Sequence, residues 1–364
     1  MNYLRLRQQI YGWLLVGPFV ITLIVLFLYA LLRTIYFSFT RYDLFNDAVW
    51  IGVNNFTELL NDSLFLIALS NTIFFSLIVT VIQTILALAL AILVNSKVRG
   101  KGFFRTAFYI PGILSSASVT LIFIWLYQKN GYLNSFVSSV ANHYPQLSCF
   151  LLTALGCQFL LVVNDKRKGL PVGWFDPAWG MLSVIIALAV TYIVSTLGWI
   201  DATDRIIEVN WLSTREKAGP MPVTLWAIVI QNIYTTIPTF MLLFLAGLQG
   251  IPGELYEAAR IDGANKWQQH WHITIPQLAP VTFVVVTFSI IGTLQMFDQV
   301  ALLGASAPLE SRITLAYYVY HNAFPPGGTP QVGIASAAAL ILAFITLIIV
   351  YLQKIFGVKE KAHG

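Results

Sequence analysis

Charged residues are scarce in this sequence. They make up 10% of the 364 residues, whereas hydrophobic residues make up 57%. A soluble domain carries about 25% charged residues, so this chain could not cover a surface that faces water. Its apolar runs are long and continuous rather than short and alternating, which also excludes the strands of a β-barrel. The composition therefore predicts an all-α polytopic membrane protein.

The sequence also lacks the short motifs that carry enzymatic chemistry. It has no G-x-x-x-x-G-K-S/T phosphate loop, no H-E-x-x-H or C-x-x-C motif and no serine nucleophile elbow. His270 and His272 would point in divergent directions on a helix, so no metal site is expected. Cys149 and Cys157 would lie about 12 Å apart along a helix axis, too far for a disulfide. We expect a chain that is not itself an enzyme and holds no cofactor.

Eight apolar runs approach or exceed the length of about 20 residues that a helix needs to span a bilayer. They are 13–37, 68–94, 105–127, 147–163, 178–199, 223–248, 277–303 and 333–356. The first run is far longer than the apolar part of a signal peptide and has no evident small-residue cleavage site. We expect it to be an uncleaved first span.

Basic residues give these spans an orientation. When the N-terminus is placed inside, most of the 21 Lys and Arg residues fall in cytoplasmic segments, as the positive-inside rule requires. The C-terminus is then inside as well. The cluster NDKRKG (164–169) makes the runs 147–163 and 178–199 a hairpin that goes inward and returns. The net charge of +5 thus marks a membrane side and does not indicate nucleic-acid binding.

One predicted cytoplasmic segment, 249–276, is too polar to span. Proline at position 252 suits a first helical turn, and Gly263 can break the helix, so two short helices joined at this glycine are expected, the second ended by Pro276. Small side chains at Ala258 and Ala259 allow another surface to approach closely. The segment could lie on lipid as amphipathic helices or dock a cytoplasmic partner.

The run EAARIDGANKWQQHWHITIPQLAP (257–280) resembles the EAA motif of permease subunits of binding-protein-dependent ABC importers. The stretches FLAGLQGIPGELYEAA (244–259) and RTAFYIPGILSS (105–116) are similar to the sugar-permease type, in particular the larger maltose permease subunit. FTELLNDSLFLIALSNTIFFS (56–76), QMFDQV (295–300) and YYVYHNAF (317–324) also fit. The sequence departs from the pattern at His270, at Ile275 and in LLGASAP (302–308).

The resemblance implies a domain division. Residues 1–138 and 210–364 would form the two parts of a six-helix permease core, and 139–209, an inserted hairpin with an outer loop, has no counterpart in that pattern. It also implies partners: a second permease subunit, an ABC ATPase dimer that binds ATP and Mg²⁺, and an extracytoplasmic solute-binding protein. The chain would lie, surrounded by lipid, in the cytoplasmic membrane of a bacterium or archaeon. Its ATPase-coupling residues would be Glu257, Ala258, Ala259, Asp262 and Gly263.

Polar side chains inside the spans indicate where a solute could bind, because they are costly unless they face the bundle interior or a water-filled cavity. The resemblance places solute contacts at Asn232, Thr236, Thr239, Ser289 and Thr293. Hydroxyl and amide groups suit a sugar, and Tyr234 or Phe297 could cover an apolar ring face. Hydrogen bonds between helices are the alternative role for the serines and threonines.

Three function classes follow. The first is the membrane-spanning subunit of an ATP-driven importer for a sugar or sugar-like solute. The second is an ion-coupled secondary transporter, in which Asp298 would relay protons rather than form a hydrogen bond in an outer vestibule. The third is a membrane-embedded enzyme. The EAA segment favours the first. A disaccharide, an oligosaccharide, a compatible solute or glycerol phosphate all remain open as the solute.

Overall fold

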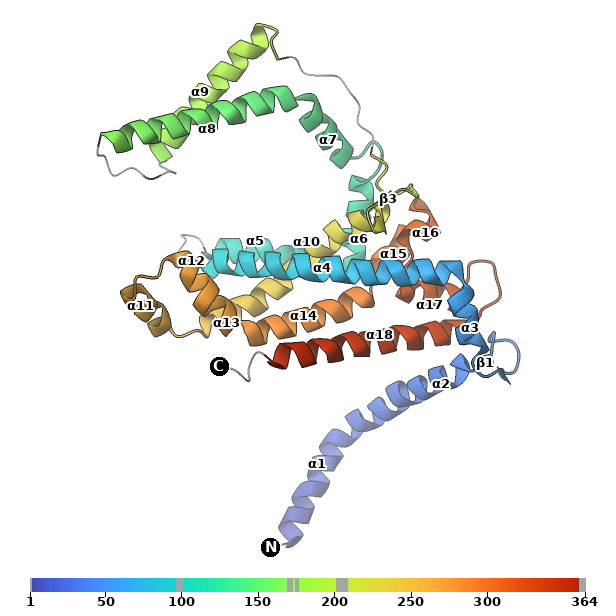
Figure 1. Ribbon diagram of the computed structural model, residues 1–364. Coiled ribbons are helices and arrows are strands. Elements are labelled where there is room, and N and C mark those ends of the chain that lie inside the picture. Colours follow the sequence, from blue (N-terminus) through green and yellow to red (C-terminus); the bar gives the residue numbers. More distant parts are fainter. Residues whose placement is uncertain (1, 96–100, 169–172, 174–176, 201–208, 360–364) are drawn as a thin grey trace. The chain divides into compact units, whose positions relative to one another are not determined.

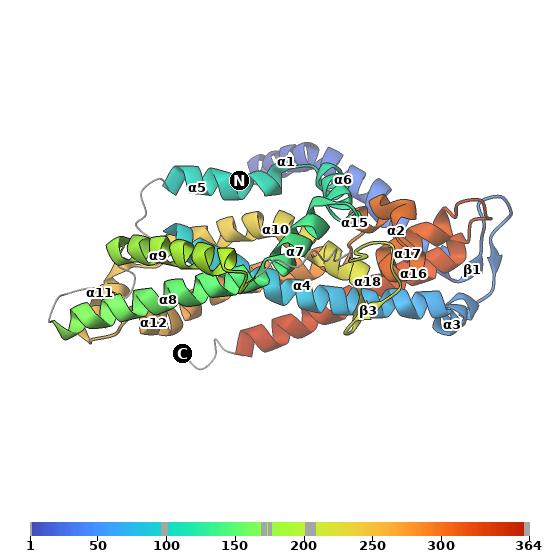
Figure 2. The same ribbon diagram turned by 90° about the horizontal axis from the view of Figure 1, so that it is seen from above.

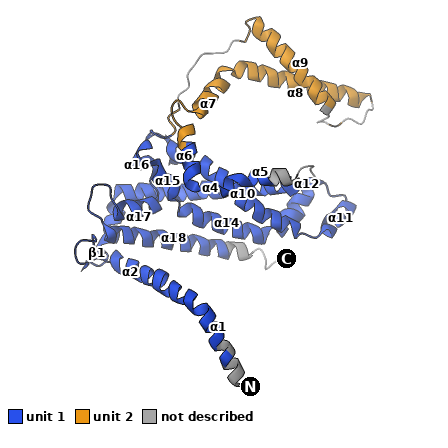
Figure 3. Ribbon diagram, turned by 180° about the vertical axis from the view of Figure 1, so that it is seen from behind, with its two compact units in different colours: residues 1–123, 212–364 blue, residues 124–211 orange. Residues whose placement is uncertain are grey.

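The computed structural model describes residues 2–95, 101–168, 173, 177–200 and 209–359. The chain divides into two compact units. Unit 1 consists of residues 1–123 and 212–364, and unit 2 of residues 124–211 (Figure 3). Both units are helical in their described parts, and their strands are limited to two short hairpins in unit 1. The predicted division at residues 139 and 209 stays a prediction.

The first part of unit 1 contains the N-terminal helices and one strand pair. Its elements are α1 (Asn2–Thr22), the π-helical turn η1 (Leu23–Leu28), α2 (Tyr29–Ser38), β1 (Thr40–Arg41), β2 (Val49–Trp50), α3 (Asn54–Asn61), α4 (Ser63–Asn95), α5 (Lys101–Ile113) and α6 (Ser116–Leu126), whose last turn belongs to unit 2.

The second part of unit 1 contains the other strand pair, the predicted coupling segment and the last spans. Its elements are β3 (Lys217–Ala218), β4 (Met221–Pro222), α10 (Val223–Gln249), α11 (Gly253–Ile261), α12 (Lys266–Gln269), η2 (His270–Thr274), α13 (Ile275–Gln277), α14 (Ala279–Leu294), α15 (Asp298–Leu303), η3 (Gly304–Ser306), α16 (Leu309–Arg312), α17 (Leu315–Ala323) and α18 (Val332–Lys359).

Helix α4 organises unit 1, because it packs along both α10 and α14, and α14 in turn packs on α18 (Figures 1 and 2). Small residues of α4, Ala87 and Ala91, are fully buried against Phe240 and Phe244 of α10. Helices in a bilayer gain no hydrophobic driving force from such contact, so close van der Waals packing between small and large side chains holds them together. The apolar core of unit 1 therefore lies between α4, α10 and α14.

Seven helices in the described residues are long and apolar enough to cross a membrane. They are Ile10–Ser38, Ser63–Asn95, Tyr144–Arg167, Ala178–Thr196, Val223–Gln249, Ala279–Ser306 and Val332–Ile355. Each coincides with a predicted run, and the short run 147–163 is extended by three residues at one end and four at the other. The predicted all-α polytopic fold is confirmed, whereas the orientation with both termini inside stays a prediction.

The predicted span 105–127 is not one unbroken helix. Helices Thr106–Ile113 and Ser116–Leu126 meet at an angle of 98°. Proline at position 111 lacks an N–H to donate. The next residue, Gly112, packs closely against α10. A Cβ atom on Gly112 would lie 3.2 Å from Cβ of Pro238. The stretch is a broken span or a re-entrant element rather than a straight helix.

The strand pair β1–β2 is tied to the start of α18. The backbone carbonyl of Thr40 lies so close to Gly333 that a Cβ atom there would be 2.2 Å from its oxygen. Nδ2 of the buried Asn55 donates to the carbonyls of Ser38 and Thr40, each at 2.9 Å. Glycine is therefore required at position 333 by a close backbone approach.

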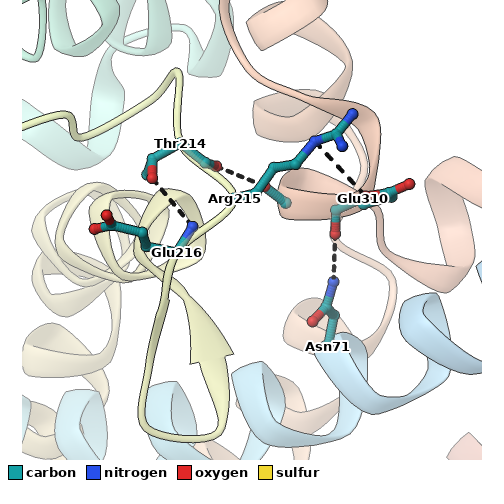
Figure 4. Close-up of polar contacts among 6 residues, drawn as sticks. Asn71, Thr214, Arg215, Glu216 and Glu310 are labelled. Carbon is teal, nitrogen blue, oxygen red and sulfur yellow. Dashed lines mark hydrogen bonds and ion pairs between the residues drawn. The ribbon is translucent and has the colours of Figure 1, made fainter.

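A second tie joins the segment before β3 to α4 and α16 (Figure 4). The hydroxyl of Ser311 donates to the carbonyl of Thr214 at 2.6 Å, and Nδ2 of Asn71 donates to the carbonyl of Ile313 at 3.0 Å. Both donors are buried. The ion pair between Arg215 and Glu310, with Nε and Oε2 3.8 Å apart, is exposed. Exposed pairs contribute little, so the buried bonds to backbone hold this region.

Unit 2 contains α7 (Tyr132–Asn142), α8 (Tyr144–Arg167) and α9 (Pro177–Thr196), with α8 and α9 packed against each other as the predicted hairpin requires. Side-chain hydrogen bonds join the pair. The hydroxyl of Ser183 donates to Oε1 of Gln158 at 2.7 Å, and Nε1 of Trp179 donates to Oδ2 of Asp165 at 2.9 Å. Few other residues of these spans are buried, which leaves their apolar side chains facing outward.

Candidate functional site

The predicted coupling segment forms two short helices with a glycine turn between them, as expected. Helix α11 ends at Ile261, and Gly263 follows in the left-handed region with φ of 81°. This conformation is strained for other residues and easy for glycine. The amide of Ala264 then donates to the carbonyl of Ala259 at 2.8 Å. This bond satisfies a carbonyl that the end of the helix would otherwise leave without a partner.

The second helix begins at a capping box. Oδ1 of Asn265 accepts from the amide of Gln268 at 2.9 Å, and Oε1 of Gln268 accepts from the amide of Asn265 at 2.8 Å. The helix continues as a π turn and then passes Pro276 to Gln277. The helix therefore ends one residue after Pro276, close to the predicted end.

The predicted coupling residues are accessible. Among the described side chains of α11, none is buried, and Glu257, Ala258, Asp262 and Gly263 are all exposed. Ala259 is half-buried and lines a recess of about 280 Å³ between α11 and α12. Ile261 is 87% exposed. Helix α11 lies at the end of unit 1 opposite α17 (Figures 1 and 2).

A buried polar cluster joins α4, α10 and α14. Its centre is Gln83, whose Nε2 donates to Oγ of Ser289 and whose Oε1 accepts from Oγ1 of Thr236 at 2.6 Å. The hydroxyl of Ser289 also donates to that of Thr80 at 2.8 Å, and the hydroxyls of Ser76 and Thr293 are 2.8 Å apart. Three of the five predicted solute contacts, Thr236, Ser289 and Thr293, are therefore engaged between helices.

The other two predicted contacts lie elsewhere on α10. Thr239 is exposed, with its Oγ1 beside Gly112 of α5. Asn232 is 92% buried, since only 8% of its surface is exposed. Its Nδ2 donates to Oε1 of Gln299 on α15 at 3.2 Å, while its Oδ1 has no hydrogen-bond partner among the described residues. A buried acceptor of this kind is costly unless something else supplies a donor.

Asn232 lines a recess of about 200 Å³ in unit 1. Its wall is formed by residues of α6, α10, the C-terminal part of α14, α15 and the break before α15: Ser116, Asn232, Gly292, Gln295, Met296, Phe297, Asp298 and Gln299. Asp298 is exposed at the start of α15. Amide, hydroxyl and carboxylate groups thus gather around an aromatic ring, which suits a polyhydroxylated solute.

The predicted site residues do not include Gln83, Ser76 or Thr80. Their spacing of four and three residues in the run 68–94 puts them on one helix face, and that spacing is the signal that could have found them. Ser116 and Gln299 carry no such signal, because they reach the recess only through the break between α5 and α6 and the break before α15.

Comparison with known proteins places the chain in a family. The family described as binding-protein-dependent transport system inner membrane component matches residues 83–359. The chain belongs to this family. It is accordingly a multi-pass subunit of the cytoplasmic membrane and a transport component rather than an enzyme, in an importer with a second permease subunit, a separate ABC ATPase and a solute-binding protein, as the resemblance implied.

Curated relatives match along nearly the whole chain. A probable starch degradation products transport system permease protein of Thermoanaerobacterium thermosulfurigenes is 27% identical, over 96% of this chain and 95% of its own. A lactose transport system permease protein of Rhizobium radiobacter is also 27% identical, over 96% and 95%. A solved bacterial ABC transporter involved in import of the acidic polysaccharide alginate has a TM-score of 0.66 at 20% identity, over 98% and 99%, which shows the shared fold.

Proposed function

We propose that the recess around Asn232 is where this permease subunit contacts its solute, and that the solute is a neutral saccharide. The observation that carries the proposal is Oδ1 of Asn232, a buried acceptor that has no partner among the described residues and that a sugar hydroxyl would satisfy. Relatives described as permeases for starch degradation products and for lactose support the saccharide class.

The charge of the recess supports a neutral solute. Asp298 is the one charged residue among those that line it, and no lysine or arginine is among them. Nearby, Arg312 is buried and donates from Nη1 to the carbonyl of Val300 at 2.8 Å, so its guanidinium serves the backbone. A carboxylate or phosphate in the recess would meet the Asp298 carboxylate without a compensating cation, which disfavours glycerol phosphate and acidic sugars.

Within this proposal, the buried cluster positions Asn232 instead of contacting the solute. Oγ1 of Thr236 lies 2.6 Å from the carbonyl of Asn232 and 2.6 Å from Oε1 of Gln83. Gln83 thereby connects α4 to the helix turn that carries Asn232. The hydroxyls of Ser289 and Thr293 have partners on α4 and hold α14 beside it.

We also propose that α11 and the Gly263 turn transmit ATPase movement to the spans. Exposed Glu257 and Ala258 would meet the ATPase. The hydroxyls of Tyr256 and Thr274, 3.0 Å apart, connect α11 to the π turn that leads into α14. A displacement of α11 would therefore reach α14, whose C-terminal end forms part of the recess.

The test is uptake of a labelled neutral disaccharide into proteoliposomes that hold the complete importer with saturating binding protein. Asn232→Leu should lower uptake about tenfold, since a lost hydrogen bond to solute costs roughly 1–2 kcal/mol. Thr84→Val is the matched control, because it removes a buried hydroxyl that belongs neither to the cluster nor to the recess, and it should stay within about twofold. Unchanged uptake in Asn232→Leu, or equal losses in both variants, would contradict the proposed contact.

A further inference from the structure

A row of aromatic rings leads away from the recess. Phe297, which lines the recess, meets Tyr320 of α17 edge to face, with ring centroids 5.1 Å apart. Tyr320 in turn meets Phe324 at 5.5 Å. We call Phe297, Tyr320 and Phe324 the aromatic row.

A second layer holds the row in place. The ring of Tyr317 lies 6.2 Å from Phe297 and 6.1 Å from Tyr320. The guanidinium of Arg312 covers Tyr317 at 4.6 Å from its centroid, and both residues are buried. Because this cation is fixed by bonds to backbone carbonyls, Tyr317 has little freedom to move. The row therefore rests on a rigid base.

Exposure of the rings increases with distance from the recess. Phe297 is half-buried, Tyr320 is 45% exposed and Phe324 is 61% exposed. Exposed aromatic rings on a polytopic protein often face lipid at the interface. Here, however, α17 is not among the candidate spans, and the row is continuous with a recess that carries Asn232 and Asp298. Such a polar end does not suit a lipid tail.

We propose that the aromatic row is a second saccharide-binding site, which holds further pyranose rings of a neutral oligosaccharide whose leading ring occupies the recess. This rests on the proposed function. Aromatic side chains bind with their apolar faces and lose little conformational entropy, and a pyranose ring has an apolar face of C–H groups. The row extends the recess, whose volume of about 200 Å³ limits how much of a longer saccharide it could hold.

The test compares a short and a long saccharide. Maltose and maltotetraose serve as neutral probes, and saturation-transfer NMR gives their dissociation constants for the complete importer in nanodiscs. The variant is Tyr320→Leu with Phe324→Leu, which keeps apolar bulk and removes the flat faces. The control is Tyr351→Leu, which alters an aromatic side chain on α18 that is 64% exposed and lies outside the row.

We expect maltotetraose to bind the double variant about threefold to tenfold more weakly than the native protein, and maltose to change by less than about twofold. The control should bind both probes as the native protein does. If the double variant bound both probes equally more weakly, or lost the second permease subunit on purification, the aromatic row would be a packing surface and the proposed saccharide-binding site would be wrong. Unchanged binding would overturn it as well. If the native importer binds neither probe, the proposed function fails and the row fails with it.

Discussion

Two buried amide side chains between the spans, Gln83 and Asn232, differ in their hydrogen bonding. Gln83 is 99% buried, and both ends of its amide are bonded, to Ser289 and to Thr236. Asn232 is nearly as buried, but its Oδ1 has no hydrogen-bond partner in the part of the chain that the structure describes. A satisfied amide stabilises helix contacts, whereas a buried amide oxygen without a donor costs free energy until a donor reaches it. Gln83 thus has a structural role, and Asn232 remains the proposed solute contact.

Replacing Gln83 by leucine should destabilise unit 1. Two bonds between helices are lost, at roughly 0.6 kcal/mol each and at most about 1.7 kcal/mol, so the expected loss is about 1 kcal/mol with a lower Tm. Thr84→Val is the control, since Oγ1 of Thr84 is buried without a hydrogen-bond partner among the described residues. Thermal unfolding of the importer in nanodiscs measures both. A control variant that melts as early as Gln83→Leu would contradict this account.

At this scale the sequence predicts which residues are polar inside the spans, and Asn232 was among them. It does not predict which of them are already bonded. Thr236, Ser289 and Thr293 have the same residue types and helical spacing whether α4 or a solute meets them. Their partners are more than 150 residues away in the sequence, and only the packing of α4 on α10 and α14 selects those partners.

At the scale of elements, the turn at Gly263 is the feature that the sequence predicts best. An amphipathic stretch with a proline before it and a glycine after it has few alternatives to a short helix that ends there. The break between α5 and α6 was missed, because the run 105–127 is apolar throughout and hydropathy does not register a bend. One cause of the break is the close contact of Gly112 with Pro238 and Thr239. This is a tertiary contact, which hydropathy along the chain does not report.

Replacing Gly263 should weaken the coupling between ATP hydrolysis and transport, although the new side chain would meet no other atoms. A Cβ atom on Gly263 would meet nothing within 4 Å, but φ of 81° strains any residue that has one, by about 1–2 kcal/mol. We expect Gly263→Ala to lower solute-stimulated ATP hydrolysis by about fivefold. Gly253→Ala, also in open space and without positive φ, should leave it unchanged. Phosphate release measures the hydrolysis. Full solute stimulation in Gly263→Ala would contradict the proposal that the Gly263 turn transmits ATPase movement.

At the scale of the whole molecule, the family match from 83 to 359 leaves the first span, Ile10–Ser38, outside it. Composition alone indicates the number and position of most spans, because bilayer thickness sets their length. It does not indicate how the chain divides into two units, since the α8–α9 pair has the same hydropathy pattern as the core spans but packs mainly on itself.

The central claim is that ATP hydrolysis in a companion chain moves the spans through the segment 249–276. The most direct measurement is uptake of a labelled neutral saccharide into proteoliposomes that hold either this chain alone or the complete importer with binding protein and ATP. The account predicts uptake against a gradient in the complete importer and none in the chain alone. Uptake by the chain alone, with or without an ion gradient, would contradict it.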